Sequence, residues 1–269
     1  MTVKLEDITI GADPELFLTR KGKFVSAYNM IPGTKNKPHR VNNGAVQVDG
    51  MALEFNIEPA KSPTVFVRNI REVLTQLRDM VPREYNLSKK AVAEFDEAYF
   101  WQQPQEALRL GCDPDFNAYT KEINVPPDAA TEKRTAAGHI HIGWTQGAKE
   151  HDPEHMLMCA TLAKALDVTL GVPSVLLDED RTRRPMYGCA GSFRPKKYGC
   201  EYRVLSNFWI KNGKLARWVY DQAKGTVESL LNGYNFDYLP EESIRDVIDN
   251  YDVVNAQEAV LMYGLRVPR

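Results

Sequence analysis

Apolar and polar residues alternate through the first part of the chain, and this period of two predicts β-strands. The dipeptide Lys21-Gly22 predicts a turn between the first two strands. Asp49-Gly50 favours a tight hairpin between the next two. The expected strands are residues 8–19, 23–30, the two halves of 45–57, 139–144 and 198–210.

The later part of the chain changes to the spacing of amphipathic helices. The first helix is expected to begin at Pro63 and to end before Pro82, and another should begin at Asp152-Pro153. Residues 86–98 fit either a polar helix or a strand. The helix from Asp152-Pro153 should run to about Thr169, with Gly171 as its stop. Further helices are expected at 214–231, ended by Asn232-Gly233, and at 241–249 and 256–265.

Strands predominate in the first half of the chain and helices in the second, which favours an α+β fold over a wound βαβ fold. The expected strand at 53–57 has an apolar face, which predicts a sheet packed on helices with a polar face opposite. No loop has the composition of a linker, so residues 1–269 are expected to form a single domain.

The charge balance gives no reason to expect a nucleic-acid or membrane partner, since 34 basic residues face 36 acidic ones. The start of the chain lacks the apolar stretch of a signal peptide, and no apolar run approaches a membrane span. The four cysteines show no CxxC spacing, which is typical of free thiols in a reducing compartment. We therefore expect a cytoplasmic protein, and the sequence leaves open whether it forms an oligomer.

Polar residues inside the expected strands form the first candidate site. Asp13 and Glu15 are two positions apart and point the same way in a strand, where two carboxylates repel unless a cation or proton lies between them. Glu54 belongs to a second polar group, which consists of Asp49, Glu54, Asn56 and Glu58. An ordinary strand facing water would carry either pattern, so neither group is specific by itself.

A histidine pair and a basic loop add to this picture. His139 and His141 share one face of a short strand, an arrangement found in metal sites and also in buried structural histidines. The loop before residue 201 carries many cations, which suit a phosphate or carboxylate ligand, although a solvated loop has the same composition. Its basic residues are Arg181, Arg183, Arg184, Arg194, Lys196 and Lys197. Together the groups have the composition of a divalent-cation and polyphosphate site.

The order of these motifs resembles the glutamine synthetase and glutamate–cysteine ligase superfamily, and more closely the phage carboxylate–amine ligases of the phiEco32 type. The resemblance lies in the stretches GADPELFL, VDGMALEFNIEPA, GCDPDFN, GHIHIGW and YGCAGSFRPKKYGCEYRVLSN. It implies a glutamine synthetase-like domain, with a twisted, mainly antiparallel sheet and helices on one face. It also implies ATP and Mg²⁺, or Mn²⁺ in its place, on the concave face.

The resemblance assigns roles residue by residue. The metal ligands it implies are Asp13, Glu15, Glu54, His139 and Glu201. Arg203, Arg194 and Arg184 would hold phosphates and the substrate carboxylate, with Lys196 and Lys197 near the nucleotide and His141 near the transferred phosphate. The chain departs from the family at Gln47, because the family has a carboxylate there and glutamine is a poor metal ligand. Asp49 could take the place of that missing carboxylate. Asp113 or Asp115 is expected to take a proton from the amine.

The activity implied by the resemblance is amide formation through an acyl phosphate, with small-molecule or peptide acids and amines as substrates. This chemistry needs no protein nucleophile, in keeping with the absence of a convincing Ser or Cys triad. A metal-dependent hydrolase would use the same carboxylates and histidines. A non-catalytic phage protein that keeps the fold is the other alternative.

Overall fold

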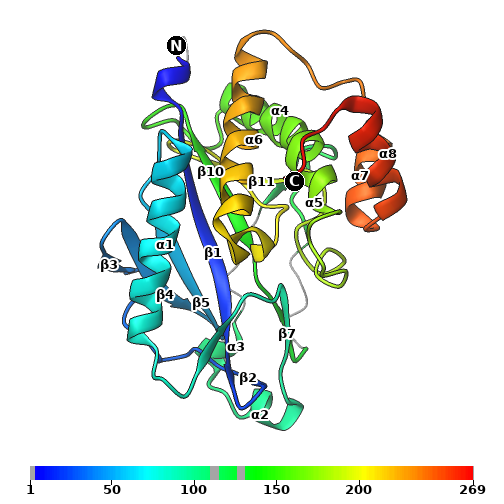
Figure 1. The fold of residues 1–269 in the computed structure, drawn as a ribbon. Coiled ribbons are helices and arrows are strands. Elements are labelled where there is room, and N and C mark those ends of the chain that lie inside the picture. Colours follow the sequence, from blue (N-terminus) through cyan, green and yellow to red (C-terminus); the bar gives the residue numbers. More distant parts are fainter. Residues whose placement is uncertain (1–3, 110–114, 126–130, 269) are drawn as a thin grey trace.

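Strand β1 (Thr9–Arg20) is the centre of a ten-stranded sheet in the computed structural model, which describes residues 4–109, 115–125 and 131–268 (Figure 1). It pairs with β5 (Ala52–Ile57) on one side and with β10 (Gly138–Gly143) on the other. From one edge of the sheet to the other, the strands are β3 (His39–Val41), β4 (Gly44–Asp49), β5, β1, β10, β12 (Gly199–Tyr202), β11 (Ser192–Lys196) and β8 (Phe116–Asn117). Two further strands, β2 (Lys23–Val25) and β6 (Asn86–Ser88), also pair with β1. The pairings between these strands are antiparallel.

Each central strand separates an apolar face from a polar one. Ile10, Leu53 and Ile140 are fully buried in one continuous core. Because side chains alternate along a strand, the residues between them point to the opposite face of the sheet. That face therefore receives the acidic residues and histidines of β1, β5 and β10.

Three long helices cover the apolar face. Helix α1 (Pro63–Met80) contacts β4 and β5, α4 (Pro153–Leu166) contacts β11 and β12, and α6 (Gly213–Leu231) contacts α1, α4 and β1. Figure 1 shows α1 and α6 on the same side of β1. Ser62 caps α1 by accepting a hydrogen bond from the Val65 N–H, which satisfies one free donor of the first turn. The three long helices therefore do not cover the polar face, where the acidic residues and histidines lie.

The remaining elements are short and lie around the ends of the sheet. Strands β7 (Val92–Glu94) and β9 (Lys133–Thr135) form a separate pair. Helices α7 and α8 contact the end of the α4–α5 segment. The other elements are η1 (Leu5–Asp7), α2 (Glu97–Trp101), α3 (Gln105–Leu108), α5 (Val172–Ser174), η3 (Asn207–Lys211), α7 (Glu241–Asp249) and α8 (Val253–Tyr263).

The fold class and most predicted elements are confirmed: the protein is α+β with a mainly antiparallel sheet. The hairpin at Asp49-Gly50 and the helix from Pro63 are present. Residues 86–98 contain two short strands and the start of α2, so the helix alternative was wrong there.

Three predicted element ends were wrong. The strand expected over 23–30 ends at Val25. The helix from Pro153 does not stop at Gly171; it continues through a π turn, residues 167–171, to Ser174. Gly171 provides close packing instead, since a Cβ there would lie 2.6 Å from Ile248 Cδ1. The strand expected over 198–210 ends at Tyr202, and the chain then forms the turn η3.

One segment is long and apolar enough to cross a membrane by length and composition alone. It is the continuous helix Pro153–Ser174, and 61% of its most apolar window is buried inside the fold. The core helix of a soluble protein has the same character, so the segment is weak evidence for a membrane span.

Gly138, at the start of β10, has no room for a side chain. A Cβ would lie 2.4 Å from Trp209 Nε1 and 2.6 Å from the Ser206 carbonyl oxygen. We expect Gly138→Ala to lower the free energy of unfolding by about 1–3 kcal/mol in urea denaturation, because these neighbours must move. Gly225→Ala in α6 is the matched control: its Cβ meets nothing within 4 Å, so it should stabilise the protein by about 0.5–1 kcal/mol. Unchanged stability of Gly138→Ala would contradict this packing.

Candidate active site

Six side chains with metal-ligating atoms gather on the polar face of the sheet in two groups of three. Asp13, His139 and Glu201 form what we call the histidine cluster, and the carboxylate cluster consists of Glu15, Asp49 and Glu54. Within each cluster, one ligand atom from each residue lies within 4.8 Å of the others. All six predicted metal ligands are thus brought together.

The strand register explains the two clusters. Asp13 lies directly opposite His139 across the β1–β10 pair, and Glu15 lies opposite Glu54 across the β1–β5 pair. Opposed residues of an antiparallel pair have Cβ atoms only about 4.5–5.5 Å apart. Since Asp13 and Glu15 are two residues apart on β1, they bring the clusters together on one face.

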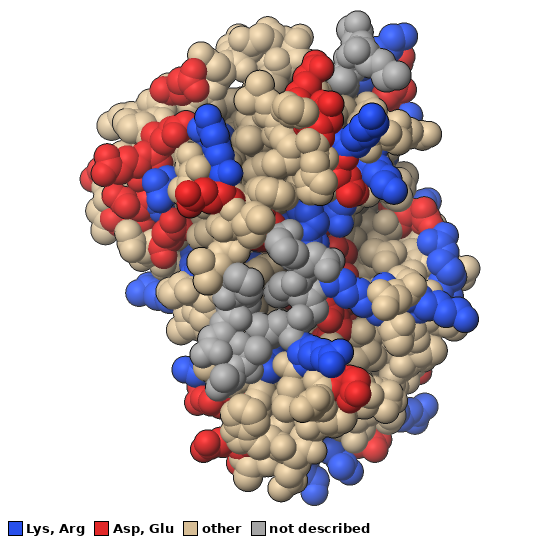
Figure 2. All heavy atoms as spheres, turned by 180° about the vertical axis from the view of Figure 1, so that it is seen from behind, with Lys and Arg blue, Asp and Glu red and all other residues tan. Residues whose placement is uncertain are grey.

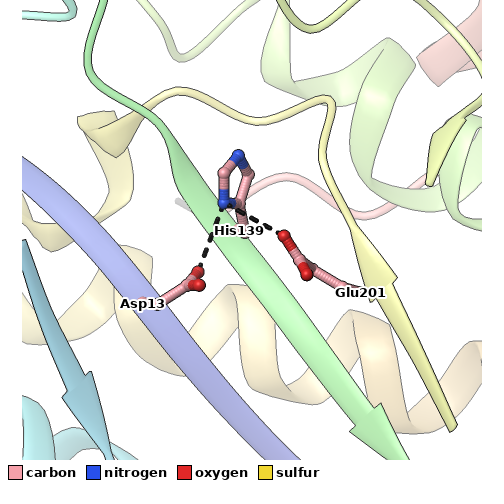
Figure 3. Close-up of side chains that lie close together, drawn as sticks. All are labelled: Asp13, His139 and Glu201. Carbon is pink, nitrogen blue, oxygen red and sulfur yellow. Dashed lines mark ion pairs between the residues drawn. The ribbon is translucent and has the colours of Figure 1, made fainter. Parts of the chain in front are cut away.

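His139 provides the nitrogen atom at the centre of the histidine cluster (Figure 3). Its Nδ1 lies 3.3 Å from Asp13 Oδ1 and 3.5 Å from Glu201 Oε1. Burial and the nearby Arg203 lower the pKa of His139 to about 4, so the imidazole is neutral at pH 7. A neutral imidazole can present the lone pair that a metal ion requires.

The two carboxylates of this cluster are ionised. Burial opposes the charge of Asp13, but His141, whose own pKa is raised, outweighs it and keeps the pKa of Asp13 well below its ordinary value. Burial and Asp13 also oppose the charge of Glu201, yet His141 and Arg194 hold its pKa low. The cluster therefore offers one neutral nitrogen and two anionic oxygen donors.

Three cationic side chains contact Glu201. Lys196 Nζ lies 2.9 Å from Glu201 Oε2, Arg194 Nη1 lies 3.4 Å from both carboxylate oxygens, and Arg203 forms a close ion pair with Oε1. Arg203 is itself buried and pairs with Asp115 at 2.9 Å. We call these three side chains, Arg194, Lys196 and Arg203, the cationic wall; it lies beside the histidine cluster.

The carboxylate cluster holds three acidic groups in a half-buried position. The Ala137 N–H donates to Glu15 Oε2 at 2.7 Å, and Gln47 Nε2 donates to Glu54 Oε2 at 2.8 Å. Burial and the charge of Asp49 raise the pKa of Glu15 to about 8, and burial with the neighbouring carboxylates raises the pKa of Glu54 well above its ordinary value. Such a group is stable only with bound protons or a cation.

The residues at both clusters fit a divalent cation. Asp13 Oδ1 is buried and accepts no hydrogen bond within the described part of the chain. Carboxylate oxygens with one imidazole nitrogen suit Mg²⁺ or Mn²⁺ better than soft metals. Asp49, rather than Gln47, completes the carboxylate cluster, and Gln47 instead orients Glu54.

Two hollows meet at the clusters. A cavity of about 240 Å³ contains both clusters and the cationic wall. A wider groove of about 950 Å³ lies beside it, and Asp13, Glu54 and Lys35 line both. On the face seen in Figure 2, basic and acidic side chains lie side by side near the middle of the molecule.

Several predicted site residues lie elsewhere. Arg184 is buried and donates to Ser174 Oγ at 2.7 Å, and it is not among the residues that line the cavity. Lys197 is exposed in the turn between β11 and β12. Asp113 lies outside the described residues, whereas Asp115 is buried in its ion pair with Arg203.

The cavity also contains side chains that the sequence analysis did not single out. They are Lys35, Arg109, Arg134 and Tyr187. Arg134 is buried and donates to the Leu108, Thr131 and Lys133 carbonyl oxygens, and its guanidinium lies over the Phe100 ring at 4.6 Å. Isolated basic residues in the sequence give no sign of this convergence.

The raised pKa of Glu15 has a measurable consequence for stability. The pKa of about 8 in the folded protein lies above the ordinary glutamate value of 4.5, so between these two pH values the folded state binds a proton that the unfolded state does not. The metal-free protein should therefore lose stability as pH rises through this window. We expect Glu15→Gln to be more stable than the parent at pH 8.5 by urea denaturation in EDTA, with a smaller difference at pH 5. Equal pH profiles would contradict the repulsion among these carboxylates.

Comparisons with known proteins give a family match and a similar solved structure. The family model described as "Phage phiEco32-like COOH.NH2 ligase-type 2" matches residues 130–236. No curated protein matches the chain. The crystal structure of a bifunctional glutathione synthetase from Pasteurella multocida has a similar fold, with a TM-score of 0.50 and 12% identity, over 97% of this chain and 44% of that one. This chain thus spans less than half of that protein's length.

The family match includes β10 and β12, with His139 and Glu201, and also the basic loop between them. The structural likeness, at this low identity, shows a shared fold only. Over residues 130–236, the family match confirms the resemblance to phiEco32-like carboxylate–amine ligases that the sequence indicated.

Proposed function

We propose that the protein is an ATP-dependent carboxylate–amine ligase that forms an amide bond through an acyl phosphate, with two divalent cations. Residues 1–269 would act as one glutamine synthetase-like catalytic domain. The observation that carries this proposal is the pair of adjoining ligand clusters, with five carboxylates and one neutral imidazole, beside a cationic wall.

The carboxylate cluster supports the cations most directly. Two unit charges 4 Å apart repel by about 4 kcal/mol at the effective dielectric of a protein surface. Three carboxylates within 4.8 Å of one another therefore need compensation. Mg²⁺ is the expected ion, with Mn²⁺ as its substitute, and it would polarise the phosphate oxygens when bound.

The two hollows indicate where the substrates bind. The groove of about 950 Å³ is large enough for a nucleotide, and Trp144 and Tyr198 line it. The cavity of about 240 Å³ is smaller than typical sites for drug-sized ligands and is rich in cations. We therefore place ATP in the groove, with its terminal phosphate at Asp13 and Glu54, and the acid substrate in the cavity.

Two balanced steps would follow. In the first, a carboxylate oxygen of the substrate attacks the γ-phosphorus of ATP, a P–O bond forms, and ADP leaves with the electrons of the broken P–O bond. In the second, the amine nitrogen attacks the acyl carbon, phosphate leaves, and the nitrogen loses a proton. Catalysis would come from alignment and from charge stabilisation, so the protein needs no nucleophile.

The cationic wall has a role in both steps. Arg194, Lys196 and Arg203 approach Glu201 from the cavity side, where phosphoryl charge would develop. Arg109 and Lys35 extend the cationic lining toward the substrate carboxylate. Arg184 and Lys197 lie away from these contacts, and we do not include them among the phosphate ligands.

The reaction class is tested by product analysis. A thermal-shift screen with Mg²⁺ and ATP should raise the unfolding temperature, since ligand binding stabilises the folded state. ADP and phosphate should then appear only when a suitable acid and amine are both present, in amounts equal to the amide formed. Hydrolysis of an ester or amide without ATP would favour a metal-dependent hydrolase. Absence of ATP binding would favour a non-catalytic protein.

The proposed environment is cytoplasmic, the host cytoplasm if a phage encodes the chain, with small-molecule or peptide acids and amines as partners and no nucleic acid. A screen of carboxylic acids would identify the acid substrate, and a screen of amino acids and peptides would identify the amine.

Glu201→Gln should abolish ATP-dependent turnover, by at least about 100-fold, because the amide removes an anionic ligand from the histidine cluster. Far-UV circular dichroism should show an unchanged fold. Glu179→Gln, on an exposed side chain that pairs with Lys211, is the matched control and should keep full activity. Activity of Glu201→Gln close to the parent value would remove Glu201 from the cation site.

Arg194→Ala should raise the KM for ATP or for the acid about 10- to 100-fold, since a buried charge-assisted contact is worth about 1.5–3 kcal/mol. Steady-state kinetics with each substrate varied in turn measure the effect. Arg217→Ala, in an exposed i,i+4 pair with Asp221, is the control and should leave both KM values unchanged. Unaltered kinetics for Arg194→Ala would place Arg194 outside the site.

A further inference from the structure

Tyr198 connects the wide groove to the histidine cluster. It lies in the turn between β11 and β12 and lines the groove, and its hydroxyl is in hydrogen-bond contact with His141 Nδ1. His141 belongs to β10, so this contact joins β10 to the turn between β11 and β12. Neither residue is one of the six side chains of the two clusters.

The other ring nitrogen of His141 faces a cluster residue. His141 Nε2 lies 3.0 Å from Asp13 Oδ2. The remaining oxygen of that carboxylate, Oδ1, is the one 3.3 Å from His139 Nδ1. The sequence of contacts therefore runs from Tyr198 through His141 to Asp13, and it ends at the atoms that would ligate a cation.

The backbone around Tyr198 is held in place. Its carbonyl oxygen accepts hydrogen bonds from the Trp144 N–H at 2.9 Å and from the Thr145 N–H at 3.1 Å. The next residue, Gly199, has φ +152°, and a Cβ there would lie 2.0 Å from the Ile142 carbonyl oxygen. Only glycine fits this close approach. The turn is thus fixed against the end of β10, which sets the position of the Tyr198 ring.

We infer that Tyr198 is a positioning residue: its hydroxyl fixes the orientation of the His141 ring, which holds the Asp13 carboxylate with Oδ1 directed at the cation of the histidine cluster. Partners that orient metal ligands in this way change metal affinity by about 10- to 100-fold when they are removed. The inference rests on the proposed function, because it requires a cation in this cluster.

This arrangement gives His141 a role different from direct contact with the transferred phosphate. Both of its ring nitrogens already have a protein neighbour, Tyr198 on one side and Asp13 on the other. His141 would act through Asp13, and Tyr198 would act through His141. The three residues should therefore affect cation binding as one unit, which a double-mutant cycle can detect.

The experiment is a titration of the EDTA-stripped full chain with Mn²⁺ alone, followed by electron paramagnetic resonance of free Mn²⁺. The parent protein should bind two ions. Tyr198→Phe keeps the ring and removes the hydroxyl, and it should weaken one of the two sites about 10-fold while the other is unchanged. Tyr238→Phe, on an exposed tyrosine beside Tyr263, is the control and should match the parent.

A second variant separates positioning from a general loss of structure. His141→Gln should weaken the same site, and the double variant with Tyr198→Phe should show little further loss. Independent losses that add in the double variant, equal weakening of both sites, or parent-like binding by Tyr198→Phe would overturn the inference. If the parent itself binds no Mn²⁺, the proposed function fails first, so the two failures are distinguishable.

Discussion

Electrostatic repulsion among carboxylates on one face of the sheet is the constraint on which the rest of the site depends. Five acidic side chains converge in two adjoining clusters, and in one of them Glu201 pairs with Arg194, Lys196 and Arg203. The consequence is the raised pKa of Glu15 and Glu54. A fold that stabilised itself alone would not retain this arrangement, so we interpret it as a binding site for cations.

The sheet produces this convergence through its register. The pairs Asp13–His139 and Glu15–Glu54 are cross-strand neighbours of β1, and Glu201 reaches the same face from β12. Close packing at Gly138 fixes where β10 begins, and the helices on the opposite face hold the strands in position. The same backbone that forms the core therefore determines the distances between the ligands.

Much of this could be predicted from the sequence because alternation determines which side chains share a face. Alternation predicted that Asp13 and Glu15 share a face, as do His139 and His141, and the order of the motifs along the chain indicated the family. Strand register is a tertiary property, so the sequence could not choose between Gln47 and Asp49. It did not single out Tyr198, although that residue lies within a quoted motif, or Arg134, because the contacts that bring both to the site arise only on folding. Gly171 was misread as a helix end because close packing and helix termination both require glycine.

The most direct test is a crystal structure with Mn²⁺ and a non-hydrolysable ATP analogue, measured at the manganese absorption edge. The account predicts two anomalous peaks, one between Asp13, His139 and Glu201 and one between Glu15, Asp49 and Glu54, with the triphosphate bridging them from the groove. Well-ordered nucleotide elsewhere, with no manganese in either cluster, would contradict it.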